Sequence, residues 1–163
     1  MKAFFVYLQY MWNLEVIARN VKKLNEDKAF QKVIRNPAIQ LEAIRLNRDE
    51  QLFKRGVDVF GVSMRSQYAR GSNVYADYTI AIKNDKNQPV DRVTLRDTGA
   101  MYRTFKTKIV GDELMLDVNS IKEGKDLQKT WGQFVGLDEF SIEKLVIKSK
   151  PIVLDYVKNT ILQ

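Results

Sequence analysis

The sequence predicts an α+β fold with long N-terminal helices, a small and mainly antiparallel sheet built around a central hairpin, and C-terminal helices. Apolar residues recur at helical spacing in the first and last thirds of the chain. Between them, two short segments, 106–110 and 113–118, have the character of strands. They meet at Gly111-Asp112, where glycine permits the positive φ of a tight hairpin turn.

The first element is one long helix, predicted from about Lys2 to Glu26 because apolar residues keep a helical spacing through residue 24. Its first dozen residues are apolar on several faces and need cover. The residues expected to make these contacts are Phe4, Phe5, Leu8 and Trp12. Two hypotheses stay open: this segment lies in the core of its own domain, or it packs on a neighbouring subunit. We expect residues 1–36 to form an N-terminal apolar helical arm and residues 37–163 a single α+β domain.

The next elements follow from local signals. Residues 28–34 are a short amphipathic piece, and Pro37 opens a further helix because proline is tolerated in a first turn. Gly56 is placed to end that helix as a C-terminal cap. Residues 57–76 are expected to form an extended loop with one short strand near its start. Residues 76–83 fit either a strand or a short helix.

A polar turn precedes the most distinctive stretch, V-T-L-R-D-T-G-A-M-Y-R-T-F at residues 93–105. Val93 and Leu95 alternate with polar neighbours as in a half-buried strand. Asp97-Thr98-Gly99 breaks this pattern, since aspartate and threonine cap helices and glycine permits a sharp change of direction. Residues 100–105 then fit a short helical turn.

The C-terminal part is predicted to be helical. Residues 125–131 form one short helix, closed by Gly132. Asp138 or Ser141 caps the last helix, whose apolar face continues to the end. Pro151 is expected to kink or restart it.

Composition excludes several classes of chemistry. The 163 residues contain no cysteine and no histidine. Thiolate metal sites, disulfides and serine–histidine or cysteine–histidine catalysis are therefore excluded. We expect no enzyme and no cofactor. The net charge is +7, with the basic excess in the first two thirds of the chain. It indicates acidic protein partners or a nucleic-acid backbone, or simply a soluble lysine-rich surface.

The stretch at 89–105, the turn at Trp131-Gly132 and the segment 136–145 resemble the tailed-bacteriophage virion morphogenesis proteins, also called tail-completion or neck proteins. The resemblance covers roughly residues 37–163. The matching positions are Leu95, Thr98, Gly99, Tyr102, Thr104, Phe105 and Gly132.

The resemblance implies a structural role at the head–tail junction or tail end, commonly in rings and without chemistry. The implied partners are copies of the same chain and other virion proteins, namely portal, connector or tail proteins. The implied location is the phage particle, after synthesis in the cytoplasm of the host bacterium. A basic face toward the lumen of a ring would meet packaged DNA without reading its sequence. The side chains expected there are Arg92, Arg96 and Arg103.

A metal-dependent nuclease is one alternative. Asp112, Glu113, Asp117 and the triplet Glu123-Gly124-Lys125 loosely resemble the carboxylates and lysine that hold Mg²⁺ and a phosphate. However, the triplet lies in a predicted loop over residues 120–124, and charges on a hairpin edge also discourage edge pairing.

A nucleic-acid-binding module is a second alternative, because basic and aromatic residues interleave between residues 53 and 78. These residues are Phe53, Lys54, Arg55, Phe60, Arg65, Tyr68, Arg70, Tyr75 and Tyr78. A membrane-surface role for residues 1–12 is disfavoured because this segment is poor in lysine and arginine. We therefore expect no membrane partner.

Overall fold

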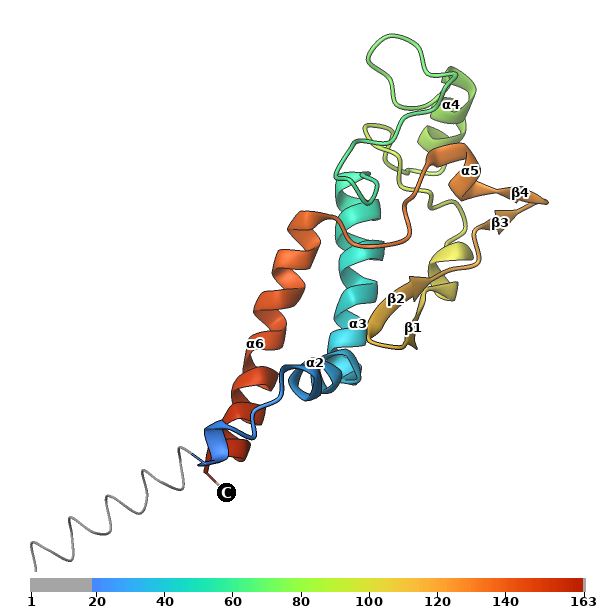
Figure 1. The fold of residues 1–163 in the computed structure, drawn as a ribbon. Helices are drawn as coiled ribbons and strands as arrows, with labels where there is room; N and C mark the ends of the chain where they lie inside the picture. Colours follow the sequence, from blue (N-terminus) through green and yellow to red (C-terminus); the bar gives the residue numbers. More distant parts are fainter. Residues whose placement is uncertain (1–18, 163) are drawn as a thin grey trace, which may run out of the picture.

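The computed structural model describes residues 19–162 (Figure 1). The predicted α+β class is confirmed: helices precede and follow two small antiparallel hairpins. The predicted arm contacts lie outside the described residues. They are Phe4, Phe5, Leu8 and Trp12.

The start of the described chain departs from prediction. Residues 19–21 are helical and the chain then turns, so the prediction of one uninterrupted helix as far as Glu26 is wrong. Asn25 instead begins a new helix, α2 (Glu26–Ile34), because its side-chain oxygen accepts a hydrogen bond from the backbone N–H of Lys28. Asparagine is a strong N-cap, and this local signal outweighs the apolar spacing that continues across the turn.

A long rod of two consecutive helices runs through the middle of the molecule (Figure 1). As predicted, α3 (Pro37–Arg45) begins with proline in its first turn. It continues into a π-helix, η1 (Leu46–Arg55), which ends at Gly56 with φ of 65°. A Cβ on this glycine would lie 2.9 Å from the Cβ of Arg92, so the close approach requires glycine.

The loop after the rod makes one isolated antiparallel bridge, between Val57 and Ser63. Helix α4 (Asp77–Asp85) then settles the ambiguous segment as helical.

The strand predicted at residues 93–95 does not form. Val93 and Thr94 are fully buried in irregular backbone, and Leu95 has φ of 51°. The side chains of two tyrosines take the place of a strand partner: the Thr94 N–H donates to the Tyr75 hydroxyl, and the Tyr102 hydroxyl donates to the Thr94 carbonyl. Both backbone groups of Thr94 are thereby satisfied without a sheet.

The central hairpin forms as predicted. A short 3₁₀ turn, η2 (Met101–Thr104), leads into β1 (Lys106–Val110), which pairs antiparallel with β2 (Glu113–Asp117). Gly111 takes φ of 60° in the turn between them.

The predicted loop over residues 120–124 is instead part of a second, separate hairpin. Strand β3 (Ile121–Lys122) pairs with β4 (Lys125–Asp126). Glu123 and Gly124 both adopt positive φ in its two-residue turn. Two positive φ angles suit a tight hairpin. The sequence carries no clear signal for it, because glutamate stands before Gly124 where asparagine or aspartate is usual.

The last elements are α5 (Leu127–Trp131), which ends at Gly132 with φ of 82°, and α6 (Glu139–Ile161). Of the two predicted caps, Asp138 is the one that caps α6, by accepting a hydrogen bond from the Ser141 N–H. Pro151 lies inside this helix without restarting it. A proline removes one backbone hydrogen bond, and a helix of 23 residues that packs on α2, α3 and η1 retains the rest.

Candidate protein-binding groove

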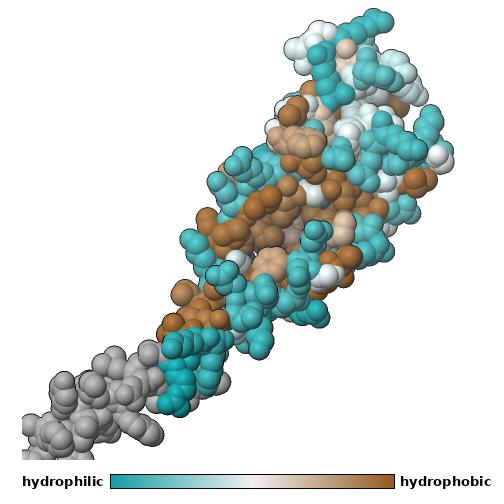
Figure 2. Space-filling model, viewed as in Figure 1, coloured by the Kyte–Doolittle hydropathy of each residue, from teal (hydrophilic) through white to brown (hydrophobic). Residues whose placement is uncertain are grey.

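An open apolar groove of about 1000 Å³ lies between α2, α3, β2 and α6. Figure 2 shows apolar surface on this face, between α6 and the β1–β2 hairpin. Side chains that line the walls include Phe30, Val33, Leu114, Leu116, Ile142 and Val146.

The periodicity of each element explains this lining. Successive side chains of a strand point to opposite faces, so Leu114 and Leu116 of β2 face the groove together. Positions three, four and seven residues apart share one helix face, which brings Ile142, Val146 and Val153 of α6 to the opposite wall.

The floor of the groove is buried, and its walls are partly exposed. Ile39 and Ala43 of α3, which form part of the floor, are each 1% exposed. In contrast, Phe30, Ile142 and Val146 are each about half exposed although they line a concavity. Scattered apolar residues are normal on a surface, but several that gather in one hollow are typical of a contact site.

One edge of the groove is acidic. It comprises Glu26 and Asp27 at the start of α2, with Asp112 and Glu113 at the tip of the central hairpin. The Gln31 side chain donates a hydrogen bond to Asp112 and so ties the hairpin tip to α2. In a chain with a net charge of +7, this acidic rim favours a partner that brings positive charge.

A polar network holds the first turn of α6 against the end of η1. Both carboxylate oxygens of Asp138 accept hydrogen bonds from the Arg55 guanidinium, and the Asp138 N–H donates to Gln51. Burial opposes the charge on Asp138, but the bonds from Arg55 and Ser141 outweigh it and lower the pKa of this carboxyl. The network thereby sets where the α6 wall of the groove begins.

The three predicted DNA-facing arginines lie together, away from the groove. Arg92 donates to the Phe53 carbonyl, and the guanidinium of Arg96 lies 5.1 Å from the centre of the Phe53 ring. Arg96 and Arg103 both approach Gly99, since a Cβ there would lie 3.9 and 3.5 Å from their nitrogen atoms.

The positions that match the morphogenesis-protein motif have structural roles in the described chain. Tyr102 and Phe105 belong to the buried core and contact each other edge to face, with ring centres 6.1 Å apart. Leu95 packs against this core. The Thr98 hydroxyl accepts the N–H of Ala100, and Gly99 turns the chain with φ of 76°. Gly132 ends α5.

The carboxylates of the nuclease alternative are spread over two hairpins. Asp117 forms ion pairs with Lys106 and Lys108, and Glu123 occupies the turn of the second hairpin. Among residues 19–162, no three aspartate or glutamate side chains lie close enough together to hold a metal ion.

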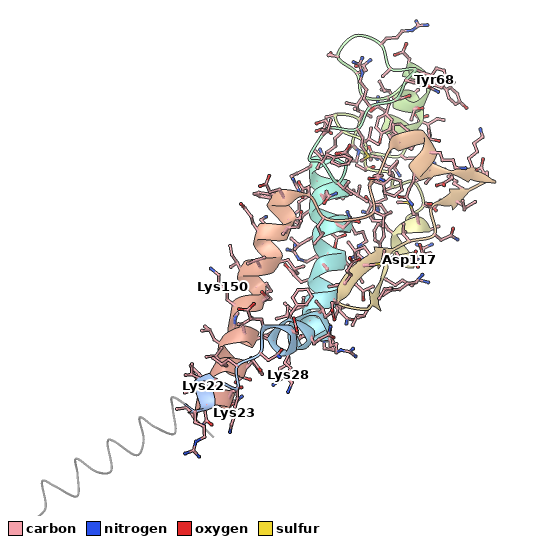
Figure 3. All side chains as sticks on the ribbon, in the orientation of Figure 1. Lys22, Lys23, Lys28, Tyr68, Asp117 and Lys150 are labelled. Carbon is pink, nitrogen blue, oxygen red and sulfur yellow. The ribbon has the colours of Figure 1, made fainter. Side chains whose placement is uncertain are left out.

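The interleaved basic and aromatic residues do not share one surface. Tyr75 is buried, and Arg55 is bound to Asp138. Phe60 and Tyr78 are exposed, as is Tyr68, which lies near α4 at the end of the molecule opposite the last turn of α6 (Figure 3). Within the described part of the chain, no helix is long and apolar enough to cross a membrane.

Sequence reasoning missed the groove. Its signal was present in the apolar spacing of residues 142, 146 and 153 and in the alternation of Leu114 and Leu116. That signal indicates which face of each element is apolar, but not which faces meet, nor that a hollow remains between them.

No family model, no curated protein and no solved structure matches this chain. The resemblance to the phage morphogenesis proteins therefore depends on the sequence motif. The fold and the groove are independent observations of this chain alone.

Proposed function

We propose that this chain is a non-enzymatic assembly subunit that docks other protein chains in the groove between α2, β2 and α6. As its setting we propose the virion of a tailed bacteriophage, in the head–tail connector, neck or tail-completion layer. Its partners there are copies of itself in a ring and portal, connector or tail proteins. The family motif supports this setting, and the groove supports the mode of action.

The observation that carries the proposal is a large groove with apolar walls, in which the charged groups lie at one rim. In sites for small molecules, by contrast, a few polar groups converge on the ligand from apolar walls and orient it. Here the carboxylates stand at one rim, and the walls present side chains such as Phe30, Leu116 and Val146. Such a surface suits the apolar face of another polypeptide.

The chemistry of the chain points the same way. The whole sequence contains neither histidine nor cysteine, the residues most often used as general base and as soft metal ligand. Lysines pair with the hairpin carboxylate of Asp117.

Two neighbouring residues of α6 provide a matched test. Val146 lines the groove, whereas Ile147 is at least as exposed and does not line it. In sedimentation of the full chain over a concentration series, Val146→Glu should weaken self-association at least about tenfold, because it places a charge in an apolar contact. Ile147→Glu should leave it unchanged. Equal behaviour of both variants and the unmodified chain would contradict docking of copies in the groove. Substrate turnover abolished by neutralising one carboxylate would contradict the non-enzymatic role.

A further inference from the structure

We propose that the groove is occupied by residues 1–18 of a neighbouring copy of this chain. This inference rests on the proposed function, which makes the groove a docking site for protein, and it names the occupant. Four properties of the chain carry it: the composition of residues 1–18, their length, the charges around the groove, and the position at which the described chain begins.

The composition of residues 1–18 matches the groove. All but four of these residues are apolar, the exceptions being Lys2, Gln9, Asn13 and Glu15. Phe5, Leu8 and Trp12 recur at positions i, i+3 and i+7, the spacing with which one helix face anchors in a groove. The walls that would receive them are formed by aliphatic side chains and Phe30.

The length also matches. The groove follows α6 from Ile142 to Val153, which at 1.5 Å per residue is about 17 Å. An eighteen-residue helix spans about 27 Å. Roughly twelve residues of the segment therefore suffice to line the groove, and about six are left to bridge the two copies.

Charge complementarity adds direction. Lys2 is the only charged side chain in the first fourteen residues, and Lys22 and Lys23 follow the segment on exposed backbone (Figure 3). The rim of the groove carries acidic side chains, among them Asp27 and Glu113. A segment with basic residues on both sides therefore meets a rim of opposite sign.

The place at which residues 19–21 contact α6 directs the segment to another copy. The side chain of Asn20, which is 3% exposed, donates a hydrogen bond of 3.1 Å to the Ile161 carbonyl at the C-terminal end of α6. Helix α2 crosses α6 one turn or more before that point, because the Asn25 N–H donates to the Tyr156 hydroxyl and the Lys32 ammonium lies 5.1 Å from the Tyr156 ring centre.

Figure 1 shows α2 between residues 19–21 and the β1–β2 hairpin, whose strand β2 lines the groove. Residue 19 therefore leaves the molecule on the far side of α2 from the groove of its own chain. A neighbouring copy presents an identical groove with no such barrier.

The absence of cysteine from the chain allows a direct test by cross-linking. One full-length copy carries Leu8→Cys, and a second, distinguishable by mass, carries Ser149→Cys, a near-isosteric change at a residue that lines the groove. The matched control replaces Ser149→Cys with Ser72→Cys, in the exposed loop before α4. After mixing under mild oxidation, the Leu8–Ser149 disulfide between copies should form at least about tenfold faster than the Leu8–Ser72 disulfide.

Two results would overturn the inference. One is a chain carrying both Leu8→Cys and Ser149→Cys that closes its disulfide internally at high dilution, which would place the segment in its own groove. The other is equal cross-linking to Ser149 and Ser72 while the unmodified chain still self-associates in a Val146-dependent way. In that second case the docking function stands and only the named occupant fails. A chain that stays monomeric at every concentration would also overturn this inference and the ring, whereas docking of a portal, connector or tail protein in the groove would stand.

Discussion

Arg55 and Asp138 lie 83 residues apart in the sequence and form an ion pair with two hydrogen bonds, of 2.6 and 2.8 Å. The Asp138 side chain is only 4% exposed and also caps α6. The pair joins the C-terminal end of η1 to the first turn of α6. This buried carboxylate therefore helps to set the position of the α6 wall relative to the helical rod that carries the floor of the groove.

Replacing Asp138→Asn should cost about 3 kcal/mol of unfolding free energy, because asparagine keeps the helix cap but leaves the Arg55 charge without its partner. Urea unfolding followed by circular dichroism measures this. The control is Asp91→Asn, which breaks the more exposed pair with Arg92 and should cost less than about 1 kcal/mol. Equal costs for the two variants would contradict a special role for the buried pair.

Stability should fall in acid through the same carboxyl. The pKa of Asp138 is lower in the folded chain than its ordinary value, so the unfolded chain takes up the proton first. Its contribution is therefore complete above about pH 5 and is lost as the pH falls through 4 and below. Unfolding free energies of the unmodified chain and Asp138→Asn, measured from pH 7 to 3, should converge toward the acid end. A constant difference would contradict this assignment.

Gly56→Ala should destabilise the chain by more than about 2 kcal/mol, since it combines a left-handed backbone with a Cβ contact of 2.9 Å to Arg92. Gly71→Ala is the matched control. It has a similar positive φ, but nothing lies within 4 Å of its new Cβ, so it should cost only about 1 kcal/mol. Thermal unfolding of both variants isolates the effect of the close approach, and identical melting temperatures would exclude it.

In the proposed setting of a phage particle, reversing Arg92, Arg96 and Arg103 to glutamate should reduce DNA retention by the particle and weaken any salt-dependent binding of DNA by the protein. These three arginines share one surface around Phe53 and Gly99. The matched control reverses three exposed lysines elsewhere. They are Lys129, Lys150 and Lys158.

Because Arg92 also holds the Phe53 carbonyl, circular dichroism must first show that the arginine variant is folded. Unchanged virions, or an equal loss from the lysine variant, would remove the proposed DNA contact.

The basic and acidic side chains on the two sides of the proposed contact between copies should be interchangeable. Reversing Lys22 and Lys23 to glutamate should weaken self-association about five- to tenfold at low salt, and the effect should fade at higher ionic strength. Adding Glu26→Lys and Glu113→Lys should restore it, because both reversed signs then attract again. Sedimentation at several salt concentrations measures this, and failure of the second pair to rescue the first would contradict contact between these residues.

Local chemistry explains which parts of the fold were predictable. Proline in a first turn and glycine in a left-handed cap bounded the α3–η1 rod at Pro37 and Gly56, and Gly111 located the central hairpin. These signals act within a few residues and need no knowledge of the rest of the chain.

Distant contacts explain the failures. Residues 93–95 alternate like a strand. However, the hydroxyls of Tyr75 and Tyr102 form the hydrogen bonds to the Thr94 backbone that a neighbouring strand would otherwise form. The groove was unpredictable for the same reason, since Leu116 of one hairpin and Val146 of the last helix line it together only in the folded chain.

The position of α2 between residue 19 and the groove has a consequence for the number of copies in an assembly. If each copy gives its first residues away and accepts those of another, any open row of copies ends with one unfilled hollow and one unplaced segment. Adding copies to the row moves the unfilled groove and the unplaced segment to new ends but does not remove them. Only closing the row into a circle does so, and growth then stops without a separate terminator.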